Sequence, residues 1–240
     1  MNSVGIIGFG RFGKILSNIL QRGFNVRVYD IKPETALTNI EFVGLEEIIK
    51  EQNIFISVPI RNFKNIISEI SPKLKNNTII DVCSVKIEPV INMLNLLPES
   101  VGIIATHPLF GPDSFNLNSN LKMMMNNTRD NYGKFDFWKN YFSSQDIEII
   151  EMSPDEHDLL AAKTQGITHF LGRVLKEFGI NQTKIDTQGF SELLDLVNQT
   201  CNDSWELFSD LQLYNPHTEK IINKLKDSTQ RVSNQLMKEK

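Results

Sequence analysis

The sequence predicts an α/β protein in which a doubly wound parallel sheet is followed by an all-helical domain. Short apolar, β-branched runs alternate with amphipathic segments through roughly the first 150 residues, as in a parallel sheet with crossover helices. From Thr187 onward the periodicity is helical only. The 240 residues are 40% hydrophobic, which is enough apolar material for one large core or two modest ones.

The predicted strands are short and mostly uninterrupted, which is typical of strands buried on both faces of a sheet. They cover residues 4–7, 26–29, 54–58, 78–82, 102–105 and 147–150. The segments between them have helical spacing; one example is the series Phe12, Ile15, Leu16, Ile19 and Leu20.

The second half begins at a helix-start signal. Ser153, Pro154 and Glu156 have the spacing of a capping box with proline at the first helical position. We expect a helix of about 25 residues ending near Gly179, and further helices broken near residues 200–202 and 215–216. The predicted domains are therefore residues 1–152 and 153–240. A small helical domain rich in apolar positions often pairs with its copy, so we expect a homodimer through it.

Composition excludes several classes of function. The net charge of -4 disfavours binding to nucleic acid or to an anionic membrane surface, and no apolar run is long enough to span a bilayer. Cys83 and Cys201 lie far apart, which disfavours a disulfide framework and a metal site. The amino terminus has no signal-peptide pattern, so the expected location is cytoplasmic.

A glycine motif follows the first predicted strand and opens the first helix. It reads Gly8-Phe9-Gly10-Arg11-Phe12-Gly13. Such glycines allow a tight turn and bring backbone N–H groups up to a pyrophosphate, so these six residues predict a Rossmann-type dinucleotide site. Asp30 lies 22 residues after Gly8, where a carboxylate binds both ribose hydroxyls and repels a 2′-phosphate. The predicted cofactor is NAD; the nearby Lys32 leaves NADP as the alternative.

Two later strands end in side chains that suit acid–base chemistry. Ser84 follows the strand at 78–82, and Thr106 and His107 follow the strand at 102–105. Ligands of open parallel sheets bind beyond the carboxyl ends of the strands, so a histidine there could be the general base of a dehydrogenase. The alternative is that His107 is a turn residue before Pro108 and Ser84 a helix N-cap.

In the helical half, Gln165, His169 and Arg173 share one predicted helix face. Such a stripe either binds a ligand or is a solvated surface. His157 lies 12 residues before His169, about 120° around a helix, so the two do not form one stripe.

Four segments together resemble the prephenate/arogenate dehydrogenase family of tyrosine biosynthesis, and plant-type arogenate dehydrogenases most. The matching segments are residues 81–86, 106–112, 156–169 and 186–190. The resemblance extends from the first strand to about Asn215 and implies an NAD(P)-binding domain followed by a helical dimerisation domain.

The resemblance implies oxidative decarboxylation of a cyclohexadienol: hydride passes from C4 to the nicotinamide, CO2 leaves and the ring becomes aromatic. By the matching motifs, His107 accepts the proton of the 4-hydroxyl, Ser84 bridges that hydroxyl and the nicotinamide, and Thr106 and His169 belong to the substrate pocket. Lys86 lies in the same motif as Ser84, as a support of the loop.

One position departs from many bacterial members. Those members carry an arginine that binds a substrate carboxylate, and this chain has Asp195 at that position. Plant-type members also lack the arginine. Arg173 is the predicted substitute. Asp203 lies in a segment that resembles the plant-type one, where an acidic residue accompanies use of arogenate; we expect arogenate to be preferred, because a carboxylate attracts its ammonium group. The alternative is that Asp203 only caps a helix.

Two other functions remain open. One is another two-domain NAD(P) dehydrogenase, of the β-hydroxyacid or imine-reductase type, in which Lys163 would be the important residue. The other is a non-catalytic NAD-responsive binding module, which should have lost His107 or Ser84.

Overall fold

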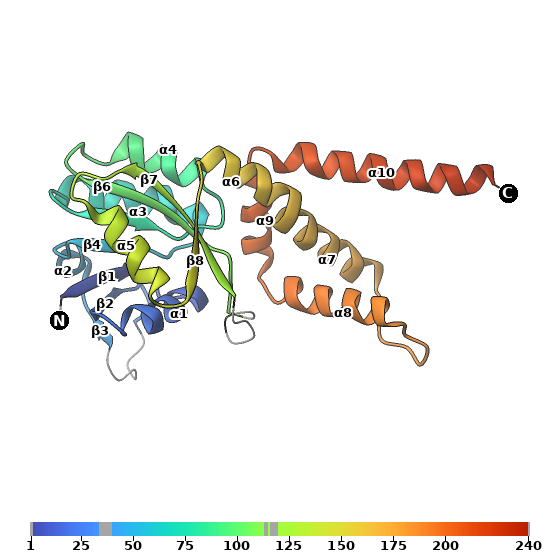
Figure 1. The fold of residues 1–240 in the computed structure, drawn as a ribbon, viewed down its shortest axis with the longest axis horizontal. Helices are drawn as coiled ribbons and strands as arrows, with labels where there is room; N and C mark the ends of the chain where they lie inside the picture. Colours follow the sequence, from blue (N-terminus) through green and yellow to red (C-terminus); the bar gives the residue numbers. More distant parts are fainter. Residues whose placement is uncertain (1, 34–39, 113–114, 116–119, 240) are drawn as a thin grey trace. The chain divides into compact units, whose positions relative to one another are not determined.

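A computed structural model of the chain describes residues 2–33, 40–112, 115 and 120–239. The chain divides into two compact units, residues 1–157 and 158–240 (Figure 1). The first unit holds the sheet, and the second is helical. Within the described residues, no helix combines the length and the apolar character needed to cross a bilayer.

The first unit is built on an eight-stranded sheet in the order β3-β2-β1-β4-β5-β6-β7-β8. The strands are β1 Ser3–Ile7, β2 Asn25–Tyr29, β3 Ile40–Phe42, β4 Asn53–Ile56, β5 Thr78–Asp81, β6 Gly102–Pro108, β7 Leu121–Arg129 and β8 Ile147–Glu151. The order β3-β2-β1-β4-β5-β6 is that of a doubly wound dinucleotide-binding sheet, so the predicted fold class is confirmed.

The sequence did not indicate two of these strands. β3 has only three residues, and β7 contains a run of methionines followed by polar residues rather than a β-branched run. β7 pairs antiparallel with β6, which is the one antiparallel pairing among the described strands. An antiparallel neighbour needs no crossover helix, so the alternating pattern that revealed the other strands is missing here.

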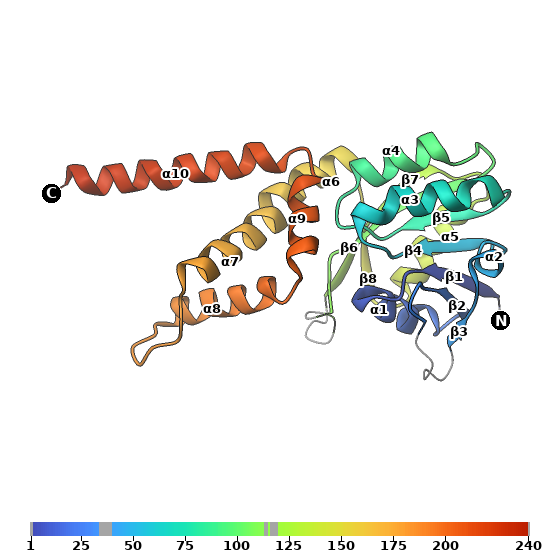
Figure 2. The same cartoon turned by 180° about the vertical axis from the view of Figure 1, so that it is seen from behind.

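Helices cover both faces of the sheet (Figures 1 and 2). They are α1 Arg11–Leu20, α2 Leu45–Ile48, α3 Ile60–Ile70, α4 Ile87–Leu96 and α5 Lys134–Ser143. Alternate residues of a strand point to opposite faces. Val4 and Ile6 of β1 therefore pack with α1 and α5, and Ile7 packs with the cluster formed by α2, α3 and α4.

Trp138 of α5 anchors the first of these two cores. Its side chain is fully buried, packs edge-on against Phe55 with ring centroids 4.8 Å apart, and donates its indole N–H to Asn53. The partner for the indole N–H removes the cost of burying that polar group.

The predicted capping box is present at the start of α6, Pro154–Ala161: the Ser153 hydroxyl accepts a hydrogen bond from the N–H of Glu156 at 3.2 Å. The expected 25-residue helix is interrupted, however. A π turn, Ala162–Gly166, separates α6 from α7, Ile167–Phe178, which ends at Gly179 in the left-handed conformation. The remaining helices are α8 Gln188–Cys201, α9 Trp205–Leu213 and α10 Thr218–Lys238.

Candidate active site

The glycine motif forms the turn between β1 and α1. Gly8 has a φ of +100°, and a Cβ there would lie 2.3 Å from the carbonyl oxygen of Ser57. A Cβ on Gly13 would lie 2.4 Å from the carbonyl oxygen of Gly8. The turn is therefore built for glycine at both positions, and it directs backbone N–H groups at the start of α1 to where a pyrophosphate would lie.

Asp30 meets this turn from the end of β2. Its carboxylate accepts hydrogen bonds from the N–H of Phe9 at 2.6 Å and from the N–H of Lys32 at 2.8 Å. The first bond fixes the carboxylate beside the glycine turn, where the ribose of a bound dinucleotide would lie. These residues fit a dinucleotide, because the turn is too tight for side chains and the acid adjoins it.

The three side chains of the motif have different surroundings. Arg11 is exposed at the first position of α1, and Phe12 is half-buried, with its ring centroid 6.1 Å from that of Phe110. Phe9 is buried and packs edge-on against Phe42 of β3. The aromatic side chains thus hold the turn against the sheet.

The second part of the site lies at the carboxyl ends of β5 and β6. These strands are parallel neighbours, with Asp81 opposite Ala105, so the residues that follow each strand meet at one edge of the sheet. Ser84 is half-buried in the segment after β5. The N-cap of α4 is Lys86, so the interpretation of Ser84 as a helix cap is wrong. His107 belongs to β6 itself and is not a turn residue.

A buried ion pair supports this edge of the sheet. Lys86 and Asp81 are both fully buried, and the Lys86 ammonium binds the Asp81 carboxylate and donates to the carbonyl oxygen of Thr106. Asp81 also accepts from the N–H groups of Cys83 and Thr106. Burial raises the pKa of Asp81, and the Lys86 ammonium opposes that shift. A pair of this kind is costly to break, because either partner alone would be an uncompensated buried charge.

Thr106 is part of this support. It is fully buried, and its hydroxyl donates to the backbone carbonyl of Asp81 at 2.6 Å. The hydroxyl therefore ties β6 to β5. A contact between Thr106 and substrate stays a prediction.

His107 is buried beside His157. Its Nδ1 lies 2.7 Å from Nε2 of His157, and both side chains are at most 5% exposed. Burial lowers the pKa of His107 well below its ordinary value, and electrostatic interactions with His157 and with the Lys86 ammonium act in the same direction. His107 is thus a neutral imidazole at physiological pH, as a general base must be.

The sequence did not reveal His157 as a functional residue. Helical spacing relates it only to His169, whereas its hydrogen-bond partner lies 50 residues earlier on β6. The only available signal was its place in the segment 156–169 that carries the family resemblance.

In the helical unit, three predicted residues come together. Arg173 of α7 donates to the carbonyl oxygens of Asp203 and Ser204, and the charges of Asp203 and Arg173 both act on His169. Burial is the main cause that lowers the pKa of His169. Among the described residues, Nδ1 of His169 and Nε of Arg173 are buried without a hydrogen-bond partner.

Two aromatic rings hold the guanidinium of Arg173. It lies 5.3 Å from the ring centroid of Phe208 and 6.0 Å from that of Trp205, in cation–π geometry. The N-cap of α9 is Ser204, whose hydroxyl accepts from the N–H of Leu207 at 3.2 Å. The interpretation of Asp203 as the helix cap is therefore wrong.

Gln165 does not continue a regular stripe with His169 and Arg173. It lies in the π turn, whose wider winding breaks the spacing of four residues that defined the stripe. The carbonyl of Gly166, in the same turn, accepts from the Gln212 side chain at 3.0 Å. Asp195 is exposed on α8.

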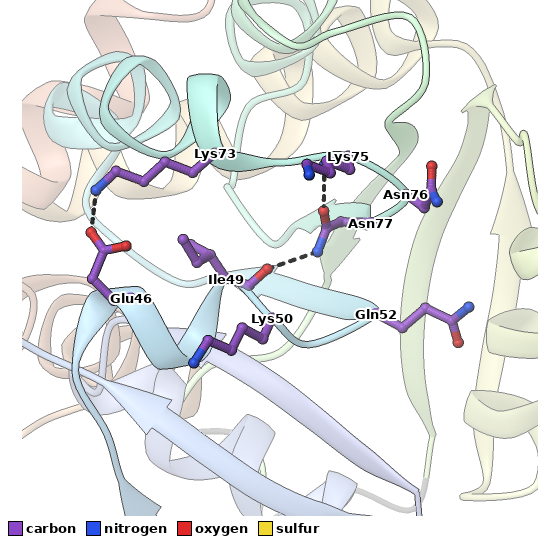
Figure 3. Close-up of a pocket in the computed structure, with 8 residues that line it drawn as sticks. All are labelled: Glu46, Ile49, Lys50, Gln52, Lys73, Lys75, Asn76 and Asn77. Atoms are coloured by element: carbon purple, nitrogen blue, oxygen red, sulfur yellow. Dashed lines mark hydrogen bonds and ion pairs between the residues drawn. The ribbon is translucent and has the colours of Figure 1, made fainter.

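A surface hollow of about 560 Å³ lies at the other edge of the sheet, before the amino ends of β4 and β5 (Figure 3). Several of its side chains bind one another or the backbone: Lys73 pairs with Glu46, and the Asn77 amide donates to the carbonyl of Ile49 (Figure 3). It is not part of the site around His107. Among the described residues, no cluster of His, Cys, Asp and Glu could hold a metal ion.

Comparison with known proteins covers both units. Residues 18–128 match the family of the prephenate dehydrogenase nucleotide-binding domain, and residues 174–240 match the family described as TYRAAT1-like, C-terminal domain. The chain is 34% identical to arogenate dehydrogenase 1, chloroplastic, of Arabidopsis thaliana over 89% of its own length and 36% of that protein. It is 29% identical to arogenate dehydrogenase 2, chloroplastic, of the same plant, over 97% and 69% of the two lengths.

Solved structures agree on the fold. The prephenate dehydrogenase of A. aeolicus, crystallised with hydroxyphenyl propionate and NAD+, superposes with a TM-score of 0.80 at 21% identity, covering all of this chain and 92% of that one.

The chain spans between about a third and two thirds of the length of the curated plant relatives. The family match of the nucleotide-binding unit and the two plant relatives agree, and both show the similarity of this chain to the prephenate/arogenate dehydrogenases.

Proposed function

We propose that the chain catalyses the NAD(P)-dependent oxidative decarboxylation of a cyclohexadienol, with arogenate preferred over prephenate. The observation that carries the proposal is His107, a buried neutral imidazole at the carboxyl end of β6, on the sheet whose first strand leads into the dinucleotide turn. Because Nδ1 of His107 faces His157, the nitrogen available to a substrate hydroxyl is Nε2.

The chemistry needs only a few groups from the protein. When bound, the nicotinamide supplies an acceptor for the hydride that leaves C4. His107 Nε2 takes the proton of the 4-hydroxyl as that oxygen gains double-bond character, and the electron pair of the ring–carboxylate bond then enters the ring as CO2 leaves. His107 returns the proton to the oxygen of the new phenol. No proton is gained or lost overall, and aromatisation drives the reaction.

Positioning falls to the remaining predicted residues. Ser84 follows β5 at the same edge as His107 and would bridge the hydroxyl and the nicotinamide. His169 Nδ1 and Arg173 Nε are buried polar atoms without partners among the described residues, which favours a ligand group there. Gln165 and Thr106 complete the proposed substrate-binding residues.

Arogenate is preferred because of Asp203. The N-cap of α9 is Ser204. Helix capping therefore does not explain the aspartate at position 203. Its carboxylate acts on His169 in the cluster proposed to bind the substrate side chain, and it would attract the ammonium of arogenate. The two plant relatives are both named arogenate dehydrogenases, which supports the same preference.

NAD is proposed over NADP because Asp30 would repel a 2′-phosphate. The cytoplasmic location also stays a prediction; the plant relatives are named chloroplastic. The homodimer remains a proposal as well, supported by exposed apolar side chains of the helical unit, including Phe178, Leu213 and Leu236.

One experiment tests the core of the proposal. Purified protein is assayed with prephenate and with arogenate, each with NAD and with NADP, by the absorbance of reduced nicotinamide. We expect the fastest turnover with arogenate and NAD. Absence of turnover in all four combinations would refute the proposed activity.

A further inference from the structure

The buried pair of imidazoles, His107 and His157, has a consequence beyond holding the two side chains together. Nδ1 of His107 lies 2.7 Å from Nε2 of His157, with the ring planes at 78°. Two nitrogens this close share one proton, so one ring donates and the other accepts. The direction of this hydrogen bond decides which nitrogen of His107 can act as a base.

We propose that His157 is a positioning residue that accepts the Nδ1 proton of His107 and thereby keeps Nε2 of His107 unprotonated for the substrate hydroxyl. This inference rests on the proposed function. In the opposite arrangement, His157 would donate to Nδ1 and the proton of His107 would lie on Nε2. That nitrogen could then donate a hydrogen bond but could not take a proton.

His157 is held in place at the start of a helix. It lies in the first turn of α6, and its backbone N–H binds the carbonyl of Ser153 at 3.0 Å. This bond holds the backbone at 157 in the helix, and Nε2 of the side chain lies within hydrogen-bond distance of Nδ1 of His107. Lys86, which also acts on His107 electrostatically, is fully buried and paired with Asp81.

The same hydrogen bond would lower the barrier of the reaction. When Nε2 of His107 takes the hydroxyl proton, the ring becomes an imidazolium, and its Nδ1–H bond to His157 becomes charge-assisted and stronger. The Nδ1 proton stays on His107 throughout, and the proton on Nε2 returns to the phenol oxygen. His157 therefore stabilises the protonated state of His107 without taking up a further proton itself.

Two substitutions separate this role from simple packing. In His157→Gln the side-chain oxygen can still accept from Nδ1 of His107, whereas His157→Leu fills the space with an apolar group. We expect kcat to fall tenfold or more in His157→Leu, to fall less in His157→Gln, and the KM values for both substrates to change little. If the two variants turn over equally, or if the leucine variant matches the wild type, the proposal is wrong.

A second measurement needs no activity. The chain has four histidines, so long-range 1H–15N spectra can be assigned by replacing them one at a time, with His217→Gln as a matched control outside the pair. We expect His107 to carry its proton on Nδ1 in the wild type and in the control, and to lose this preference in His157→Leu. A wild-type His107 protonated on Nε2 would overturn the proposal. Failure of the proposed function would instead appear as no turnover with either substrate, whatever tautomer is found.

Discussion

At the scale of single residues, the site depends on groups whose ionisation is set by burial. His107 is neutral because desolvation opposes its charged form, and the paired charges of Lys86 and Asp81 beneath it are kept from solvent. In the proposed mechanism the side chain at 107 takes up a proton, which an amide of similar size cannot do.

For His107→Asn we expect kcat with arogenate to fall by about 10²-fold or more, the usual contribution of a positioned acid–base group. Binding of NAD, measured by calorimetry, should be unchanged, because His107 is not part of the glycine turn. Turnover close to that of the wild type would show that another group takes the proton.

Asp30→Ser should shift the cofactor preference. The wild type is expected to prefer NAD, and removal of the carboxylate should bring the kcat/KM value for NADP closer to that for NAD, because the repulsion of the 2′-phosphate is lost. The ratio of the two kcat/KM values measures the effect. A wild-type enzyme that prefers NADP would contradict the role of Asp30.

Asp203→Asn should change the choice of substrate. We expect the ratio of kcat/KM values to move toward prephenate by tenfold or more, about 1.4 kcal/mol, as the attraction for the ammonium is lost. Glu192→Gln removes a charge from the exposed surface of α8 and is the matched control. An unaltered ratio in Asp203→Asn would rule out Asp203 as the selecting residue.

How far residues could be assigned from the sequence depends on whether their partners are local. Asp30 could be placed beside the glycine turn from the sequence, because a strand, a turn and a helix bring them together in a short stretch. His157 was missed because its hydrogen bond joins a helix to a strand 50 residues away. Only the folded sheet brings such a pair together.

At the scale of elements, the turn between β1 and α1 contains two glycines with different surroundings. Gly8 is required by the backbone, since its φ is +100° and a Cβ would collide with Ser57. At Gly10, a Cβ would meet no atom of the described residues within 4 Å. The fold therefore requires the first glycine and does not require the second, so we expect Gly10 to matter for a bound ligand.

Gly8→Ala should therefore lower the free energy of unfolding by more than about 1 kcal/mol, measured by chemical denaturation. Gly10→Ala should unfold like the wild type and still bind NAD at least tenfold more weakly in calorimetry, because the methyl group takes the space of the pyrophosphate. Wild-type affinity in Gly10→Ala would mean that no pyrophosphate lies there.

Elements with a strong periodic pattern were predicted well, and those without one were not. The buried parallel strands stood out as β-branched runs, whereas β7 combines methionines with polar residues and pairs antiparallel. The π turn at Ala162–Gly166 was also missed, because a single wide turn leaves the apolar spacing on either side nearly intact.

At the scale of the whole molecule, the helical unit carries exposed apolar side chains on its last helix. Val232 and Leu236 lie one turn apart on α10 and are each at least 60% exposed. Spacing of this kind places both side chains on one face of the helix, which suits contact with a second copy.

We expect light scattering coupled to size exclusion to give twice the chain mass of 27.5 kDa. The double substitution Val232→Glu and Leu236→Glu should shift the protein to the monomer, because charges cannot be buried in an apolar interface. Ile91→Glu, on the surface of α4, is the control. A wild-type protein that elutes with the mass of one chain would refute the dimer.

The placement of the two tryptophans gives the protein a built-in optical assay. Trp138 is fully buried in the sheet unit, and Trp205 is 64% exposed in the helical unit, under the guanidinium of Arg173. Their fluorescence should differ in colour, the buried indole emitting at shorter wavelength. Unfolding of each unit can therefore be followed separately in the unmodified chain, and any anion that draws Arg173 away from Trp205 should change only the longer-wavelength emission.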